Sequence, residues 1–249
     1  MGILNLTPDS FSDGGLFLSP EEALKHAYQM ADNGADIIDI GGESSRPGSN
    51  PVPAEEEIER VVGVIKELAP TLNIPISIDT SKPRVAEMSI KAGASIINDI
   101  FGLSDGLMTA IAVAYDVPAV IVHMHGSPQT FGTETMGGNA LDEIKRFLAE
   151  RARNAIDKGM KESNIIVDPG VGFGKTADQD MNIIKNSGWF SDRFPVLIGP
   201  SRKRFLSKYY PGMDADDATA AASVTAAENG ARILRVHNVS KVASLTGKL

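Results

Sequence analysis

The sequence predicts an α/β protein whose residues 1–249 form one domain, a (β/α)8 TIM barrel. Three observations lead to this prediction. Eight apolar segments of strand length alternate with helical segments, and no linker-like stretch separates them. The turns from helix to strand are tight, as at Asn33-Gly34-Ala35. The loops after the first, second and fifth strands are long and rich in Gly, Pro, Ser and Asn, which is typical of a barrel's active-site face.

A doubly wound open sheet is the alternative fold. That fold predicts one dominant phosphate-binding loop. In this chain polar residues follow nearly every expected strand instead, which favours the barrel.

The expected strands are short apolar runs bounded by turn residues. They cover residues 2–6, 36–40, 76–79, 95–98, 117–123, 164–168, 195–198 and 232–236. The first helix begins with Ser19 as N-cap, Pro20 in the first turn and Glu22 in the capping-box position, and it stops at Gly34. Further helices are expected at about 55–68, 83–92, 107–115, 141–158 and 215–229, with a short helix near the carboxyl end.

The composition narrows the class of function. A formal charge of −8 and a pI near 5.1 argue against a nucleic-acid or membrane-surface binder. The absence of cysteine from the sequence excludes disulfides, a cysteine nucleophile and thiolate metal sites. There is no apolar run of membrane-spanning length and no signal peptide, so we expect a cytoplasmic enzyme.

Nearly every expected strand ends at a polar residue. The segment 164–175 shows this most clearly, because a buried strand runs into Asp168 and is followed by Pro169 and three glycines that allow a close approach to a ligand. A capped turn explains any single case equally well, but packing alone does not place polar groups so regularly. In a closed barrel these residues converge on one mouth: Asn5, Asp39, Asp79, Asn98, His123, Asp168, Ser201-Arg202-Lys203, Arg235 and His237.

The polar residues divide into two chemistries. Asp79, Asn98 and Asp168 offer donors and acceptors suited to a flat heterocycle that carries several N–H and C=O groups. The second group is cationic and favours a phosphate or diphosphate, and its members are Arg46, Arg202, Lys203, Arg235 and His237. Strand alternation turns the last two to the same side.

Two aromatic features are interpreted as structural. The pair His123 and His125 could ligate a metal, but the sequence holds only two further histidines, and a catalytic zinc usually needs three protein ligands. We expect one of the pair to be packed or to orient a loop. Trp189 is expected in the core.

Several motifs occur in a fixed order along the whole chain. The first reads Gly2-Ile3-Leu4-Asn5-Leu6-Thr7-Pro8-Asp9-Ser10-Phe11-Ser12-Asp13-Gly14-Gly15, and the second reads Asp39-Ile40-Gly41-Gly42-Glu43-Ser44-Ser45-Arg46-Pro47-Gly48. The later ones are Ser77-Ile78-Asp79-Thr80, Ile97-Asn98-Asp99, the segment from Asp168 to Lys175, Ser201-Arg202-Lys203 and Arg235-Val236-His237. In sequence and order they resemble the dihydropteroate synthase family, a group of pterin-binding enzymes in folate biosynthesis.

The resemblance implies condensation of (7,8-dihydropterin-6-yl)methyl diphosphate with 4-aminobenzoate. By this resemblance the pterin is held by Asp79, Asn98, Asp168 and Lys203, with Val122 lining its pocket. The diphosphate is held by Ser45, Arg46, Arg235 and His237, with Val236 also among the substrate-binding residues. The aminobenzoate is flanked by Phe11, Ser45, Pro47, Phe173 and Lys203.

Further expectations concern chemistry and partners. Asp79, Asp168 and Lys203 are the expected catalytic residues, and no side-chain nucleophile is required. The resemblance implies that Asn5 binds the Mg²⁺ that accompanies the diphosphate, and that the enzyme is a homodimer and a sulfonamide target.

Departures from the family pattern leave some details open. Serine stands at Ser45 where threonine is usual, and arginine stands at Arg204 where serine is frequent, so the preferred arylamine is not fixed. The sequence starts at the first strand, so either it is trimmed or the barrel floor is capped differently. Two rival functions stay open: a pterin-binding methyltransferase domain, which has no need of Ser201-Arg202-Lys203, and a catalytically silent pterin-binding paralogue.

Overall fold

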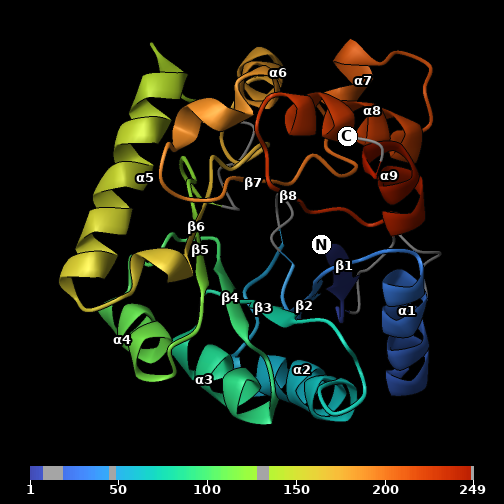
Figure 1. The fold of residues 1–249 in the computed structure, drawn as a ribbon, viewed down its shortest axis with the longest axis vertical. Helices are drawn as coiled ribbons and strands as arrows, with labels where there is room; N and C mark the ends of the chain where they lie inside the picture. The colour runs from blue at the N-terminus through green and yellow to red at the C-terminus, as the bar shows by residue number, and fades with distance from the viewer. Residues whose placement is uncertain (8–18, 45–48, 128–134, 248–249) are drawn as a thin grey trace.

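The computed structural model describes residues 1–7, 19–44, 49–127 and 135–247, and within them strands and helices alternate as expected (Figure 1). The strands are β1 (Gly2–Asn5), β2 (Ile38–Gly41), β3 (Ile76–Asp79), β4 (Ile96–Asp99), β5 (Ala119–Val122), β6 (Ile165–Asp168), β7 (Leu197–Ile198) and β8 (Ile233–Leu234). The α-helices are α1 (Pro20–Asp32), α2 (Ala54–Leu68), α3 (Pro83–Ala92), α4 (Gly106–Ala114), α5 (Ala140–Asp157), α6 (Ala177–Lys185), α7 (Leu206–Tyr209), α8 (Ala215–Glu228) and α9 (Val239–Thr246). Two short 3₁₀ turns are η2 (Glu162–Asn164) and η3 (Ser187–Phe190).

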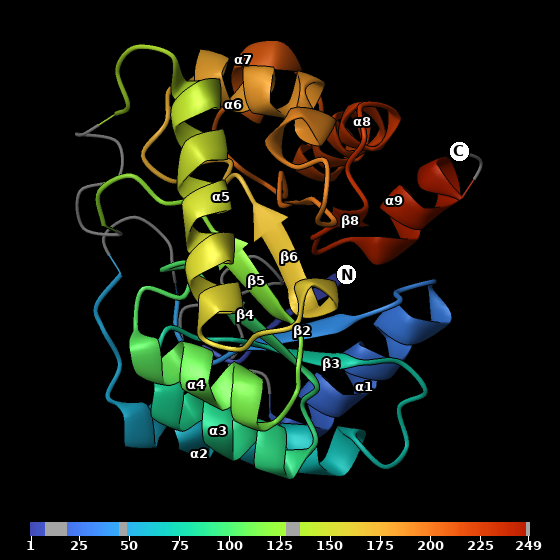
Figure 2. The same ribbon diagram turned by 60° about the vertical axis from the view of Figure 1, so that its left-hand side comes forward.

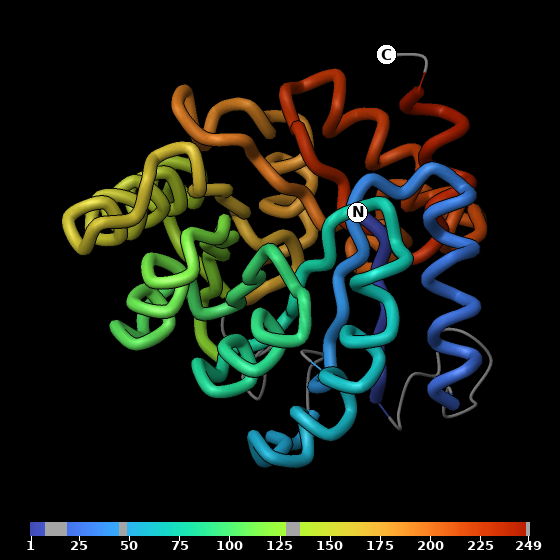
Figure 3. The backbone as a smooth tube through the Cα atoms, turned by 60° about the horizontal axis from the view of Figure 1, so that its bottom comes forward, coloured from blue at the N-terminus to red at the C-terminus, as the bar shows by residue number. Residues whose placement is uncertain are grey.

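The strands follow one another in chain order. β1 to β6 form one parallel sheet, and β7 pairs with β8. Isolated parallel bridges join the two sheets on both sides, between Val167 and Val196 and between Gly2 and Val236. Figure 3 shows the second junction, where the C-terminal segment reaches the N-terminal strand. This sequential order agrees with the predicted barrel and contradicts a doubly wound sheet, whose strand order reverses at a switch point.

Strand alternation produces two separate apolar clusters. Residues such as Leu4, Ile78 and Ile97 face the surrounding helices and join a large outer core. Met1, Ile96, Val120, Val122 and Leu197 form a smaller cluster of their own, which we call the inner cluster. Figure 2 shows the strands crossing the middle of the molecule with helices outside them, so the inner cluster is the filling of the barrel.

The inner cluster explains where polar residues can gather. Its partly buried members include Ile37, Ile166 and Ile233. Two residues further along the same strands, on the same side, the sequence has Asp39, Asp168 and Arg235. Each inward-facing row thus changes from apolar to polar towards the carboxyl end of its strand. The sequence thus places the apolar inner cluster, or apolar floor, below a layer of polar side chains. We call this the polar layer, and it includes Asp39, Asp168 and Arg235.

Most predicted element boundaries are close to the observed ones. The bounds of β3 and α3 agree with the prediction. The capping box of α1 is confirmed, because Ser19 Oγ accepts a hydrogen bond from Glu22 N at 3.2 Å and Glu22 Oε2 accepts one from Ser19 N at 2.8 Å.

Other expectations need correction. β7 and β8 are two residues long instead of four and five, because their flanking residues join the neighbouring strands only through isolated bridges. No bounds were predicted for α6 or α7. Trp189 is 50% exposed instead of lying in the core, and the Lys145 ammonium lies 4.2 Å from its ring centroid. In the described part of the chain, no helix is long and apolar enough to cross a membrane.

Candidate active site

The polar layer is brought together by the register of the parallel strands. Asn5 is paired with Gly41, Gly41 with Asp79, and Asp79 with Asn98. Further around the ring Val122 is paired with Asp168. Asn98 is paired in turn with Val120, and Val120 with Ile166, so Asp168 lies one inward-facing position further along β6. The register thus places Asn5, Asp79 and Asn98 in one row, with Asp168 on the same inward side.

Arg235, directly after β8, contacts aspartates of two other strands, β2 and β3. Its Nε donates to Asp39 Oδ2 at 2.6 Å, and its Nη2 donates to Asp79 Oδ2. The same Asp39 oxygen accepts from Asn98 Nδ2 at 3.0 Å. Burial alone would lower the pKa of Arg235, but Asp39 and Asp79 outweigh it and raise that pKa. We call Asp39, Asp79, Asn98 and Arg235 the ion-paired half of the site.

Asp39 is the member of this group that was not predicted to bind substrate. Its side chain is fully buried, and its Oδ1 has no hydrogen-bond partner among the described residues. The sequence placed Asp39 at a strand end but could not show that Arg235, 196 residues away, binds it.

Asp79 and Asp168 share a burial effect on their acidity. Burial raises the pKa of Asp79 to about 7, although Arg235 opposes the change. Burial also raises the pKa of Asp168, against the opposing influence of Lys203 and of the Gly170 amide. That amide donates to Asp168 Oδ1 at 2.7 Å. Two buried carboxyl groups with raised pKa values on the same inward side are typical of a functional site.

The other half of the site surrounds the glycine-rich loop after β6. Lys203 donates to the Val171 carbonyl, and its ammonium lies 4.4 Å from the ring centroid of Phe173. Gly172 has φ 80, which favours glycine, and a Cβ there would lie 2.8 Å from Lys203 Cδ and displace this lysine. Burial lowers the pKa of Lys203 to about 8, while Asp168 and Asp180 act in the opposite direction.

A buried lysine fixes the shape of that loop from behind. Lys175 Nζ donates to the carbonyls of Gly170 at 2.8 Å and Phe173 at 3.0 Å. It also lies 3.1 Å from His123 Nδ1. Burial, followed by the charge of Lys175, lowers the pKa of His123 to about 3, so its neutral ring accepts this hydrogen bond. We call Asp168, Lys175, Lys203 and Phe173 the backbone-held half.

These contacts settle the role of His123. Its side chain is 4% exposed and meets the ring of Phe147 edge-on at 4.9 Å. This confirms the expectation that one histidine of the pair is packed and orients a loop.

Asp180 is a second unpredicted contributor. It lies on α6, for which the sequence gave no bounds, and its Oδ1 accepts from Gly172 N at 2.7 Å. The cue available in the sequence was the Thr176–Gln179 capping box, which the structure confirms at the start of α6.

The predicted cationic group is only partly assembled. Arg202 has a left-handed backbone (φ 55) and its Nε donates to Asp216 Oδ1 at 2.7 Å, which directs it to α8. His237 Nδ1 lies 2.8 Å from Ser201 Oγ, and that oxygen also accepts from His237 N at 3.1 Å. Among the predicted cations that lie in the described part of the chain, Lys203 and Arg235 are the ones placed in the polar layer.

The remaining predicted residues occupy different places. Val122 belongs to the inner cluster and Phe173 packs against it, so both border the polar layer. Val236 is 2% exposed in the outer core, because alternation turns it away from Arg235 and His237, and only its backbone could meet a substrate. The other predicted contacts lie outside the described residues: Phe11, Ser45, Arg46 and Pro47.

An ion triad anchors both described ends of the loop after β2. Lys82 pairs with Glu43 and with the fully buried Glu57 of α2. Glu43 Oε1 also accepts from Val52 N at 3.2 Å, across the loop. These long-range pairs carry no local sequence signal, and we did not predict them.

The site can now be compared with known proteins. The profile of the family described as "Pterin binding enzyme" matches residues 1–237. The chain belongs to the pterin binding enzyme family. It is 43% identical to the dihydropteroate synthase of Bacillus subtilis over 249 residues, covering 98% of this chain and 85% of that protein. The predicted resemblance to dihydropteroate synthase is thereby confirmed.

Solved structures give the same family. The Yersinia pestis dihydropteroate synthase in complex with a sulfonamide drug is 35% identical, with a TM-score of 0.94 that covers 100% of this chain and 91% of that one. The Burkholderia cenocepacia dihydropteroate synthase complexed with 7,8-dihydropteroate is 37% identical, with a TM-score of 0.89 over 100% of this chain and 89% of that one. These matches extend over the whole chain, so the relatives share its complete fold.

Proposed function

We propose that this enzyme is a dihydropteroate synthase. It would join (7,8-dihydropterin-6-yl)methyl diphosphate to 4-aminobenzoate and release 7,8-dihydropteroate and diphosphate, in folate biosynthesis. The observation that carries the proposal is the polar layer above an apolar floor, where Asp79, Asn98, Asp168 and Lys203 come together from four strand ends. Relatives that share the fold carry this name, and one of them binds 7,8-dihydropteroate.

The pterin ring would lie in the polar layer. Its amino and ring N–H groups need acceptors, and its carbonyl and ring nitrogens need donors, because a buried polar group without a partner is costly. Asp79 and Asp168 supply acceptors, while Asn98 and Lys203 supply donors. Val122 and Phe173 of the inner cluster would contact the flat apolar part of the ring.

Binding of the pterin ring would also make the Arg235 guanidinium available to the diphosphate. Arg235 is engaged by Asp39 and Asp79, and pterin N–H groups that take over Asp79 would loosen one of these ion pairs. The freed edge of the guanidinium could then meet the diphosphate together with His237. Binding the ring would in this way direct a cation towards the leaving group.

The reaction breaks the bond between the pterin methylene carbon and the diphosphate oxygen. The electron pair leaves with diphosphate, and the positive charge that remains on the pterin is stabilised by the carboxylates of Asp79 and Asp168. The amine nitrogen of 4-aminobenzoate then bonds to the methylene carbon and loses a proton to diphosphate or water. No residue of the chain forms a covalent intermediate in this scheme.

Magnesium is proposed as the metal. The described residues contain no cluster of three or more His, Asp or Glu side chains that could hold a metal alone. Asn5 offers one amide oxygen near Gly41 at the mouth, and its side chain makes no hydrogen bond to another described residue. One protein oxygen fits Mg²⁺, which keeps several waters and takes further ligands from substrate phosphates. The ion would supply charge neutralisation for the departing diphosphate.

The decisive experiment measures diphosphate release with and without 4-aminobenzoate. We expect sustained release that requires the amine, with 7,8-dihydropteroate formed in equal amount. A methyltransferase domain or a silent paralogue would release no diphosphate in either condition, and that result would overturn the proposal. Repeating the assay with Lys203→Met, and with the exposed Lys208→Met as control, ties the activity to the polar layer.

The homodimer, the single-domain organisation and the cytoplasmic location remain predictions. The homodimer rests on family resemblance, and sedimentation of the purified protein tests it. The effect of Ser45 and Arg204 on the preferred arylamine is tested by comparing 4-aminobenzoate with other arylamines.

A further inference from the structure

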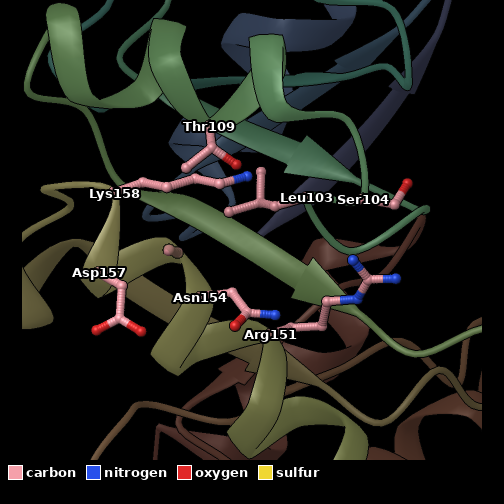
Figure 4. A pocket seen from close by; sticks show the side chains of 8 residues that line it. Leu103, Ser104, Thr109, Arg151, Asn154, Asp157 and Lys158 are labelled. Carbon is pink, nitrogen blue, oxygen red and sulfur yellow. The ribbon is translucent and has the colours of Figure 1, made fainter.

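A cavity between α4 and α5 is separate from the polar layer of the barrel. Its volume is about 270 Å³, and it is bordered by the residues before and within α4 and by the last turns of α5 (Figure 4). Its polar lining includes Ser104, Thr109, Arg151, Asn154 and Lys158. The last three are spaced at i, i+3 and i+7, so they share one face of the α5 end.

These five side chains offer hydrogen-bond donors without protein acceptors. Within the described residues, none of them donates a side-chain hydrogen bond or pairs with a carboxylate; Arg151 packs over the ring of Phe147 at 5.2 Å. Thr109 is the most informative, because it is only 1% exposed and lines the cavity with its hydroxyl unpaired. Buried polar side chains are normally hydrogen-bonded, so the unpaired Thr109 hydroxyl indicates an acceptor ligand, while Ser104, Asn154 and Lys158 are exposed.

The electrostatics of the cavity indicate the same ligand. Lys158 Nζ lies 3.5 Å from the position that a Cβ would take at Gly106, the first residue of α4. The Asp105 carboxylate caps this helix N-terminus by accepting from Leu107 N at 2.8 Å. Arg151 adds a second positive charge, and in Figure 4 the carboxylate of Asp157 points away from the ammonium of Lys158. The lining of the cavity thus carries two cationic side chains and one carboxylate, in a protein whose total formal charge is −8.

We propose that this cavity binds a small oxyanion of the phosphate type, held by Arg151, Lys158 and the Thr109 hydroxyl. Such an ion would accept a hydrogen bond from the Thr109 hydroxyl and balance the charges of Arg151 and Lys158, and the planar guanidinium suits two of its oxygens. Ser104 and Asn154 would supply further donors at the rim. The site does not depend on the proposed reaction, because none of its residues belongs to the polar layer.

The test is a titration of the full-length enzyme with inorganic phosphate, with chloride at matched ionic strength as the reference. Amide signals of residues 104–109 and the side-chain amide of Asn154, followed by nuclear magnetic resonance, report on this cavity. Signals of residues 170–174 report separately on the barrel mouth. We expect saturable shifts at 104–109 in millimolar phosphate, and at least fivefold weaker binding in both Arg151→Met and Lys158→Met.

Two further variants make the result specific. Lys161→Met removes a nearby exposed lysine that pairs with Asp116, and it should leave phosphate binding unchanged. Lys158→Arg keeps the charge and should keep the binding. The proposal is overturned if phosphate causes no saturable shift at 104–109, or if Arg151→Met and Lys158→Met bind as tightly as Lys161→Met.

Discussion

The two halves of the barrel mouth hold their charges in different ways. In the ion-paired half, Arg235 contacts the carboxylates of Asp39 and Asp79 directly. In the backbone-held half, Lys175 and Lys203 donate to main-chain carbonyls of the glycine-rich loop. A substrate can replace a side-chain partner, but it cannot replace the loop. The first half is therefore suited to exchanging partners during binding, and the second half to presenting fixed groups.

The largest expected effect comes from Gly170→Ala. Gly170 has φ 70, and a Cβ there would lie 1.8 Å from the His123 carbonyl oxygen. Both the left-handed backbone and this overlap oppose the substitution, so we expect a stability loss of about 3 kcal/mol or more and loss of activity. Urea unfolding measures the first and the diphosphate assay the second.

Gly212→Ala is the matched control. Gly212 has φ 77, but nothing lies within 4 Å of its added Cβ. Gly212→Ala should lower the free energy of unfolding by only about 1 kcal/mol, which is the cost of the left-handed backbone alone. Equal losses in the two variants would show that the close approach to His123 does not hold the loop.

The next largest effect is expected from Asp168→Asn, which removes the negative charge of this side chain and keeps its shape. The amide can still accept from the Gly170 N–H, so the loop should keep its geometry. If the carboxylate stabilises the cation, turnover should fall about 100-fold while pterin affinity falls much less. Steady-state kinetics and equilibrium pterin binding make the comparison, with the exposed Asp178→Asn as a near-silent control. Equal losses in turnover and affinity would make Asp168 a binding residue only.

A smaller effect concerns the pH dependence of stability in the ion-paired half. Because burial raises the pKa of Asp79 to about 7 from its ordinary value of 3.8, the folded protein binds more protons than the unfolded chain between these values. The contribution of Asp79 to stability therefore declines as pH rises from about 4 to about 7. Relative to wild type, Asp79→Asn should gain stability across this window in urea unfolding. A difference that does not change with pH would contradict the raised pKa.

The sequence predicted the parts of this site that depend on periodicity. A polar residue directly after a buried strand located Asp79, Asn98 and Asp168, and alternation separated Arg235 and His237 from Val236. These inferences succeed because the carboxyl ends of parallel strands meet at the same end of the barrel.

The parts that depend on long-range pairing could not be predicted. Asp39 and Arg235 are 196 residues apart, and Lys82 joins Glu43 to Glu57 across two loops. No local sequence pattern distinguishes these paired charged side chains from charged side chains that face solvent. Trp189 was misplaced for a related reason, since a lysine from α5 stacks on its exposed ring.

The central claim is that both halves grip one pterin ring, and equilibrium binding of a pterin ligand to one variant from each half tests it most directly. Asn98→Leu removes a donor of the ion-paired half, and Lys203→Met removes one of the backbone-held half. We expect each variant alone to weaken binding of the same pterin at least about tenfold, or about 1.4 kcal/mol. If either variant binds that pterin as tightly as wild type while remaining folded, the two halves do not share one ligand.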